Sequence, residues 1–155
     1  TLMQGWIELK NMDRAMDVFN GMRRTIYAPP NVATYNLLMS GWCRQMESAR
    51  TAEKVMIDLM NDPKVSPDAQ SFDTLINGYR CCRWMETNLR VERMYFWLCM
   101  MRDRRLQPTE HTAKHFRKMG LHFPAEDGPF WTTDFGMPFD PRRHGRRRRR
   151  IFFFK

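Results

Sequence analysis

The chain has 155 residues and a formal net charge of +9, from 26 Lys and Arg against 17 Asp and Glu. Residues 142–155 hold eight of the basic residues and no acid, so residues 1–141 carry only +1. The length is enough for one domain with a core, and no apolar run is long enough to span a membrane. The basic character therefore predicts a polyanion-binding tail and does not extend to the rest of the chain.

Helical periodicity divides the first part of the chain into pairs of helices. We expect residues 1–10 to hold the end of one helix and residues 12–24 to form the next. Further apolar stripes predict helices over about residues 35–46 and 49–60, and the short polar turn between them predicts an antiparallel hairpin. Ala15 and Ala52 are the small residues that would let paired helices approach closely.

The same unit recurs along the chain. Gly5-Trp6, Gly41-Trp42 and Gly78-Tyr79 stand 36 and 37 residues apart, within the range typical of stacked helix-pair repeats. Each unit ends at a proline, which cannot continue a helix; these are Pro29-Pro30, Pro67 and Pro108. We predict an all-α solenoid of about three units: 1–31 (partial), 32–68 (complete), 69–109 (irregular) and 110–120 (partial).

The third unit departs from the pattern after Met85, where a few extra residues imply a longer turn or a longer helix. Its second helix is apolar nearly all round. Either one face is core and the other a docking surface, or the helix ends the solenoid and is covered by the following segment. The apolar residues are Met94, Tyr95, Phe96, Trp97, Leu98, Met100 and Met101.

Residues 110–119 predict a further helix, in which His111 and His115 share a face but lack enough partners for a metal site. The four cysteines form no C-x-x-C pair and favour buried or idle thiols. From residue 121 to 155 the chain is rich in Pro, Gly and aromatic residues and then in Arg, and we predict an extended, non-helical segment.

Together these residues resemble the pentatricopeptide repeat family. The complete unit matches the family pattern at Val32, Thr34, Tyr35, Asn36, Leu38, Met39, Gly41, Cys43, Arg44, Ala52, Pro67 and Asp68. The resemblance covers roughly residues 1–120. It implies that the first helix of each unit lines a surface that reads single-stranded RNA at about one base per repeat.

The resemblance also implies which residues face the bases, namely the fifth and last residue of each unit. These are Asn36 with Asp68, then Asp73 with Thr109, while Asn31 closes the first unit. The family pattern for Asn with Asp implies uridine. Alternatively, Asn36 is a helix N-cap and Asp68 a turn residue after Pro67. Two or three units specify too few bases to select a transcript.

The arginine tail is the second predicted RNA contact, because guanidinium groups bind phosphates in a bidentate manner and stay charged. The residues are Arg142, Arg143, Arg146, Arg147, Arg148, Arg149 and Arg150. The alternative is a solvated or targeting-type basic run.

These features lead to three hypotheses for the function. The first is a structural subunit of the mitochondrial ribosome that binds ribosomal RNA through its tail, in the mitochondrial matrix or alternatively in a plastid. The second is an organellar transcript-binding factor, and the third is a protein–protein scaffold in another organellar complex. In the first, RNA and neighbouring proteins of a large assembly are the partners, and a free monomer is not expected. No enzyme activity, cofactor or metal is expected, because the zinc deaminase signature is absent.

Overall fold

The computed structural model describes residues 1–45, 48–121 and 123, and these residues contain seven α-helices and no strand. The helices are α1 (Leu2–Glu8), α2 (Met12–Arg24), α3 (Val32–Gln45), α4 (Ala49–Asn61), α5 (Ala69–Cys81), α6 (Thr87–Asp103) and α7 (Glu110–Lys118). The predicted all-α fold is therefore confirmed. The predicted extended tail, apart from Leu121 and Phe123, lies outside the described residues.

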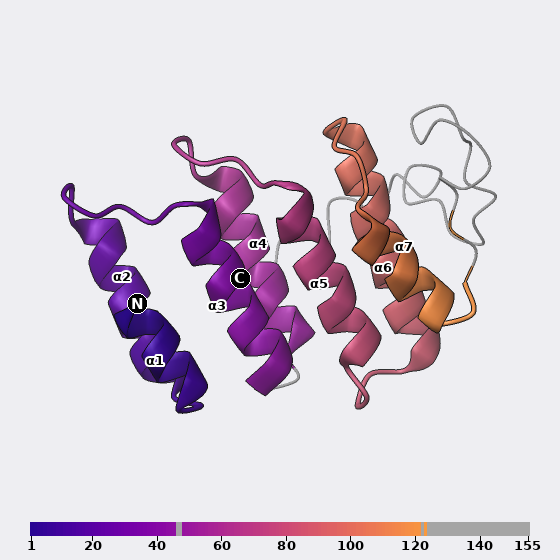
Figure 1. Cartoon of the computed structure of the whole chain (residues 1–155), viewed down its shortest axis with the longest axis horizontal. Helices are drawn as coiled ribbons and strands as arrows, with labels where there is room; N and C mark the ends of the chain where they lie inside the picture. The colour runs from indigo at the N-terminus through magenta and orange to yellow at the C-terminus, as the bar shows by residue number, and fades with distance from the viewer. Residues whose placement is uncertain (46–47, 122, 124–155) are drawn as a thin grey trace.

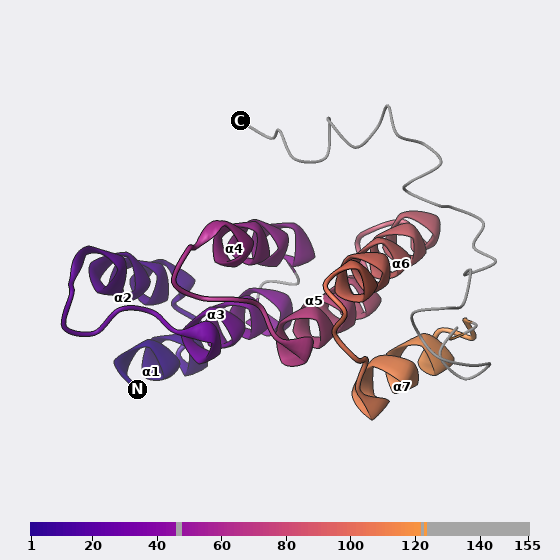
Figure 2. The same cartoon turned by 90° about the horizontal axis from the view of Figure 1, so that it is seen from above.

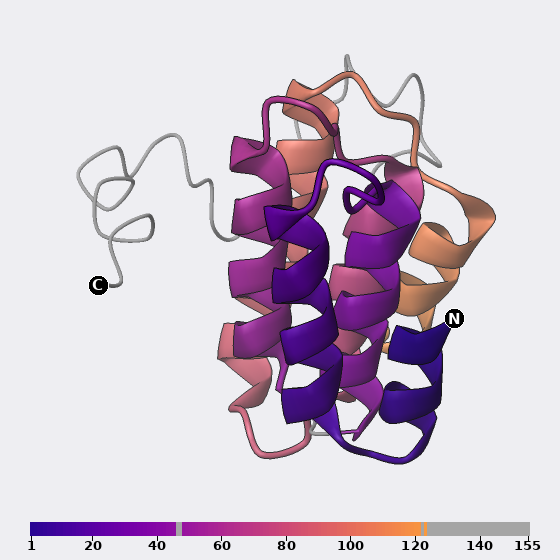
Figure 3. The same ribbon diagram turned by 90° about the vertical axis from the view of Figure 1, so that its left-hand side faces the viewer.

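The helices are arranged as an α-solenoid of antiparallel hairpins. Consecutive helices pair as α1–α2, α3–α4 and α5–α6, and each first helix also packs on the next, as α1 on α3, α3 on α5 and α5 on α7. The view in Figure 2 shows two layers, with α1, α3, α5 and α7 in one and α2, α4 and α6 in the other. Viewed along the stack from the α1–α2 end, the hairpins lie behind one another (Figure 3).

Two glycines, Gly41 and Gly78, allow close packing between successive first helices. A Cβ on Gly78 of α5 would lie 2.2 Å from Cys43 Sγ of α3, and one on Gly41 would lie 2.9 Å from Met12 Cε of α2 and 3.1 Å from Ile7 Cγ2 of α1. Ile7 and Cys43 each stand two residues after a repeat glycine, so the same contact recurs at the period that the sequence shows. The small residues Ala15 and Ala52 are fully buried, while their role in close helix approach stays a prediction.

The third hairpin is longer than the second at both its turn and its second helix. The α5–α6 turn takes residues 82–86, whereas α3 ends at Gln45 and α4 already begins at Ala49, and α6 has 17 residues where α4 has 13. The residues from Met94 to Cys99 are all buried. Phe72 of α5 packs on Trp97, with ring centroids 6.2 Å apart, and Phe116 of α7 packs on Tyr95 at 5.0 Å.

Of the two interpretations of α6, burial favours the covered one, because Trp97 packs on α5 and Tyr95 on α7. Phe123 packs in turn on α7, since its ring lies 5.6 Å from Phe116. Residues 94–99 therefore form core, and the predicted docking surface on them is wrong.

A buried acid links three helices at the centre of the stack, and the sequence pattern did not predict it. Glu53 of α4 is only 8% exposed and accepts a hydrogen bond from the hydroxyl of Tyr79 on α5. Arg93 Nη1 of α6 lies 3.4 Å from Glu53 Oε1. Burial raises the pKa of the Glu53 carboxyl, and the charges of Arg93 and Arg50 offset only part of that rise.

Among the described residues, no helix is long and apolar enough to cross a membrane. The same residues contain no cluster of His, Cys, Asp and Glu suited to hold a metal ion.

Candidate nucleic-acid interface

Three of the five predicted base-facing residues turn out to be helix N-caps. The side chains of Asn31, Asp68 and Thr109 accept hydrogen bonds from the backbone N–H three residues on, at 2.9, 2.8 and 3.3 Å, and so begin α3, α5 and α7. In each case the hydroxyl of the third helical residue, Thr34, Ser71 or Thr112, accepts from the backbone N–H of the cap. The capping box thus places these three residues at equivalent points on successive first helices.

Asn36 lies within α3 at its fifth residue, so the alternative that it caps a helix is wrong. Asn31 fills the cap, and α3 consequently begins at Val32, three residues before the predicted start. The alternative for Asp68 also needs correction, because this residue caps α5 instead of forming only a turn after Pro67.

The structure brings Asn36 and Asp68 together. Asn36 Nδ2 of α3 donates a hydrogen bond to Asp68 Oδ1 at the start of α5, over 3.2 Å. The opposite amide orientation would set two acceptor oxygens against each other, so the carboxylate fixes the orientation of the amide. Asn36 is 6% exposed, while Asp68 is partly exposed, so the pair lies at the edge of the buried interior.

The hydrogen bonds around Asp68 use only one of its two carboxylate oxygens. Oδ1 accepts from the Ser71 N–H and from the Ser71 hydroxyl, both at 2.8 Å, as well as from Asn36. Burial alone would raise the pKa of Asp68, but these hydrogen bonds outweigh it and hold the pKa below its usual range. Asp68 is therefore a carboxylate at neutral pH, with Oδ2 as an acceptor for a further donor.

Asn36 also keeps hydrogen-bonding capacity. Its Oδ1 is buried and has no hydrogen-bond partner among the described residues. Its second Nδ2 hydrogen is not used by the bond to Asp68, because an amide nitrogen carries two. An unmet buried acceptor costs about 1–3 kcal/mol, and such atoms in folded proteins call for an explanation such as a ligand or water.

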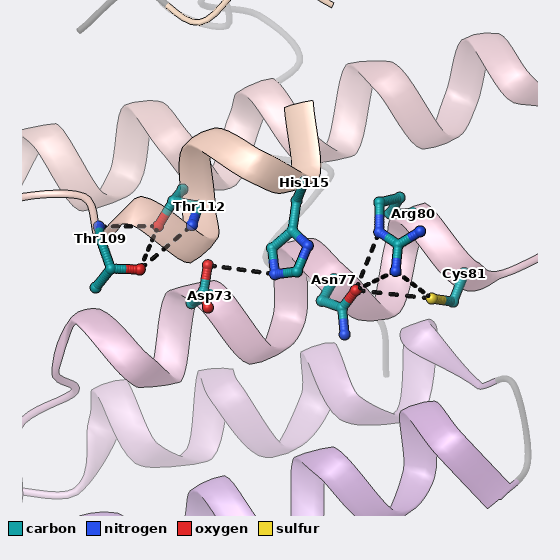
Figure 4. Close-up of polar contacts among 7 residues, drawn as sticks. All are labelled: Asp73, Asn77, Arg80, Cys81, Thr109, Thr112 and His115. Atoms are coloured by element: carbon teal, nitrogen blue, oxygen red, sulfur yellow. Dashed lines mark hydrogen bonds and ion pairs between the residues drawn. The ribbon is translucent and has the colours of Figure 1, made fainter. Parts of the chain in front are cut away.

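The second predicted pair is not joined in this way. Asp73 Oδ1 on α5 lies 3.6 Å from His115 Nε2 on α7, as Figure 4 shows, and the two side chains are 16% and 12% exposed. The Thr109 hydroxyl contacts Thr112 within its own cap, at 3.2 Å. The sequence predicted Asp73 and Thr109 as partners, whereas each has a different neighbour on α7.

The first-helix surface carries a further polar group that the sequence reasoning missed. Arg80 Nε and Nη2 donate to Asn77 Oδ1 at 3.1 and 2.7 Å, and Nη2 lies 3.1 Å from Cys81 Sγ (Figure 4). Asp73, Asn77 and Arg80 are spaced by four and three residues, which places them on one face of α5. That spacing was visible in the sequence and is the signal that could have found Arg80.

The predicted phosphate-binding residues Arg142, Arg143, Arg146, Arg147, Arg148, Arg149 and Arg150 lie outside the described residues. His111 is exposed on α7, and no metal-ligand group forms around it among the described residues.

Comparison with known proteins agrees with the repeat pattern. A chloroplastic pentatricopeptide repeat-containing protein of Arabidopsis thaliana is 33% identical to this chain over 78 residues, which are 50% of this chain and 10% of that relative. The chain thus spans about a tenth of the length of the curated relative that it matches. No family model matches the chain. The match, together with the stacked hairpins, confirms the resemblance to the pentatricopeptide repeat family.

Proposed function

We propose that this chain is an RNA-associated helical-repeat segment of an organellar protein, and that the Asn36–Asp68 pair reads one uracil of a single strand. The proposal rests on the hydrogen bond of 3.2 Å that joins the two side chains and leaves Asp68 Oδ2 and one Asn36 N–H for a ligand. RNA recognition by repeat proteins uses two or three side chains per base, which is the number available here.

The hydrogen-bonding edges favour uracil over cytosine. Uracil N3–H is a donor, and Asp68 Oδ2 accepts it, while a uracil carbonyl accepts the remaining Asn36 N–H. Cytosine N3 is an acceptor and would face the carboxylate without a hydrogen between them. A good bidentate contact discriminates by about 1–3 kcal/mol, which corresponds to roughly tenfold or more in affinity.

The test is a binding titration of the full chain with short single-stranded RNAs that differ at one nucleotide. We expect a preference for uracil at that nucleotide, and we expect Asn36→Ala to abolish it without changing the helical circular dichroism. Asn20→Ala is the matched control, because Asn20 is exposed on α2 in the other layer. A uracil preference that survives Asn36→Ala would refute the assignment.

Asp68→Asn gives a sharper result than deletion. Asn is as good an N-cap as Asp, so α5 should still begin at residue 69. The oxygen that accepts uracil N3–H is replaced by a donating NH₂, which suits cytosine N3. The variant should therefore change the preference from uracil to cytosine, and an unchanged preference would count against direct contact.

A second candidate is a structural subunit of the mitochondrial ribosome that holds ribosomal RNA through its tail. The charge distribution favours it, since residues 142–155 carry +8 of the net +9. Deletion of these residues should then reduce the salt dependence of RNA binding by several units of slope. An unchanged slope would exclude the tail from binding, and a purified native particle without ribosomal RNA would exclude the ribosome.

The location follows as part of the same proposal. The Arabidopsis relative is chloroplastic, so an organelle is the expected compartment, with the mitochondrion and the plastid distinguished by imaging the tagged full-length protein. If the third hypothesis were right and the chain were a scaffold without RNA, ultraviolet crosslinking in extracts would yield proteins only.

A further inference from the structure

The two predicted reading positions differ in what the next first helix places beside them. Asn36 and Asp73 are the fifth residues of α3 and α5. The sixth residue of the following first helix is Thr74 for the first position and His115 for the second, counting from Ala69 and Glu110. A short hydroxyl side chain therefore stands where the second position has an imidazole.

The imidazole of His115 takes the space in front of the carboxylate at the second position. Its Nε2 faces Asp73 Oδ1 over 3.6 Å, which is too long for a hydrogen bond, and both side chains are more than four-fifths buried. Figure 4 shows His115 reaching from α7 toward Asp73 on α5, beside the Thr109–Thr112 cap. In this arrangement a planar ring presents a nitrogen to the carboxylate, as the edge of a base would.

Thr109, the other residue of the second position, is also hydrogen-bonded within the protein. The Thr109 hydroxyl accepts the Thr112 N–H at 3.3 Å and contacts the Thr112 hydroxyl at 3.2 Å. Both positions hold a buried oxygen without a hydrogen-bond partner among the described residues, Asn36 Oδ1 in the first and Asp73 Oδ1 in the second. The difference is that Asp68 is hydrogen-bonded through one oxygen only, whereas an imidazole faces the Asp73 carboxylate.

Resting on the proposed function, we propose that His115 is the specificity-determining residue that closes the second position, so that the described repeats read one nucleotide and not two. A base that entered there would have to displace the imidazole from the Asp73 carboxylate. With His115 shortened, the carboxylate is an acceptor-only group, and guanine satisfies it best because guanine N1–H and N2–H are two adjacent donors.

The experiment uses RNAs in which two adjacent nucleotides are varied independently. For the unmodified chain we expect a uracil preference at one nucleotide and equal affinities for all four bases at its neighbours. His115→Thr gives the second position the residue type that the first position has, Thr74. It should add a guanine preference of about tenfold at one nucleotide beside the preferred uracil, as expected for one bidentate base contact. His111→Thr, one turn earlier and exposed, should add none.

Each outcome bears on one of the two proposals. No uracil preference at any nucleotide defeats the proposed function and this inference with it. A uracil preference combined with a second base preference in the unmodified chain overturns the inference alone, without use of a variant. If His115→Thr lowers the melting temperature but adds no base preference, His115 only anchors α7 and the inference is wrong.

Discussion

The close packing against Gly78 predicts that Gly78→Ala changes the stability of the protein. In Gly78→Ala the new Cβ would lie 2.2 Å from Cys43 Sγ and 3.2 Å from Cys43 Cβ, so either the Cys43 side chain must rotate or α3 and α5 must move apart. Overpacking of this kind costs about 1–3 kcal/mol, and the better helix propensity of Ala returns about 1 kcal/mol. We expect a net loss of up to about 2 kcal/mol in the free energy of unfolding, measured by urea denaturation followed by circular dichroism.

Two further variants isolate the cause. Cys43→Ala removes the sulfur that the new methyl group meets, so the loss caused by Gly78→Ala should largely disappear in the double variant. Gly21→Ala is the matched control: a Cβ added to this glycine of α2 would have no atom within 4 Å, and the change should stabilise the protein slightly. A Gly78→Ala protein as stable as Gly21→Ala, or a loss that persists without Cys43, would refute the packing argument.

Three other outcomes follow from buried groups. Burial raises the pKa of Glu53 in the folded state. The carboxyl therefore contributes fully to stability below its ordinary pKa of 4.5, and this contribution is lost as the pH rises through the folded-state pKa. Glu53→Gln should remove this pH dependence from the free energy of unfolding. Cys81 is exposed, whereas burial raises the pKa of Cys43 to about 12, so a disulfide reagent at about pH 8 should modify Cys81 first and Cys43 only on unfolding. Phe116→Ala should cost about 3–5 kcal/mol in hydrogen-exchange protection of α7, because the ring is fully buried between Tyr95 and Phe123; equal protection in the variant would contradict this.

The sequence was sufficient for the hairpin stack because its main determinants are local and repeated. The apolar stripes, the glycine-aromatic period and the terminating prolines each act within one unit, and all of them indicate the same architecture. Ala15 and Ala52 were identified as close-packing residues for the same reason, since a small side chain on an apolar stripe indicates that a second helix approaches there.

The site was only partly predictable, because its contacts depend on pairs of residues far apart in the chain. Asn36 is of a residue type that often caps helices, but Asn31 is the cap, because it forms reciprocal hydrogen bonds with Thr34. The neighbours of Asp73 and Glu53 depend on how α6 and α7 dock, which a period broken by extra residues does not specify. Whether the identified pair reads a base, and where the unit boundaries fall, stay predictions.

The recurring contact between a repeat glycine and the side chain packed against it also limits where further hairpins can be added to the stack. Ile7 and Met12 fill the space at Gly41 and Cys43 the space at Gly78, and Cys43 is the twelfth residue of its helix. Since each hairpin in such an array interacts only with its neighbours, a copy of residues 32–68 inserted before Ala69 should lengthen the rod at no cost to the existing joints. The same copy placed directly after α7 would dock poorly, because that helix ends at Lys118, its ninth residue, and offers its new neighbour no helical side chain at the twelfth place.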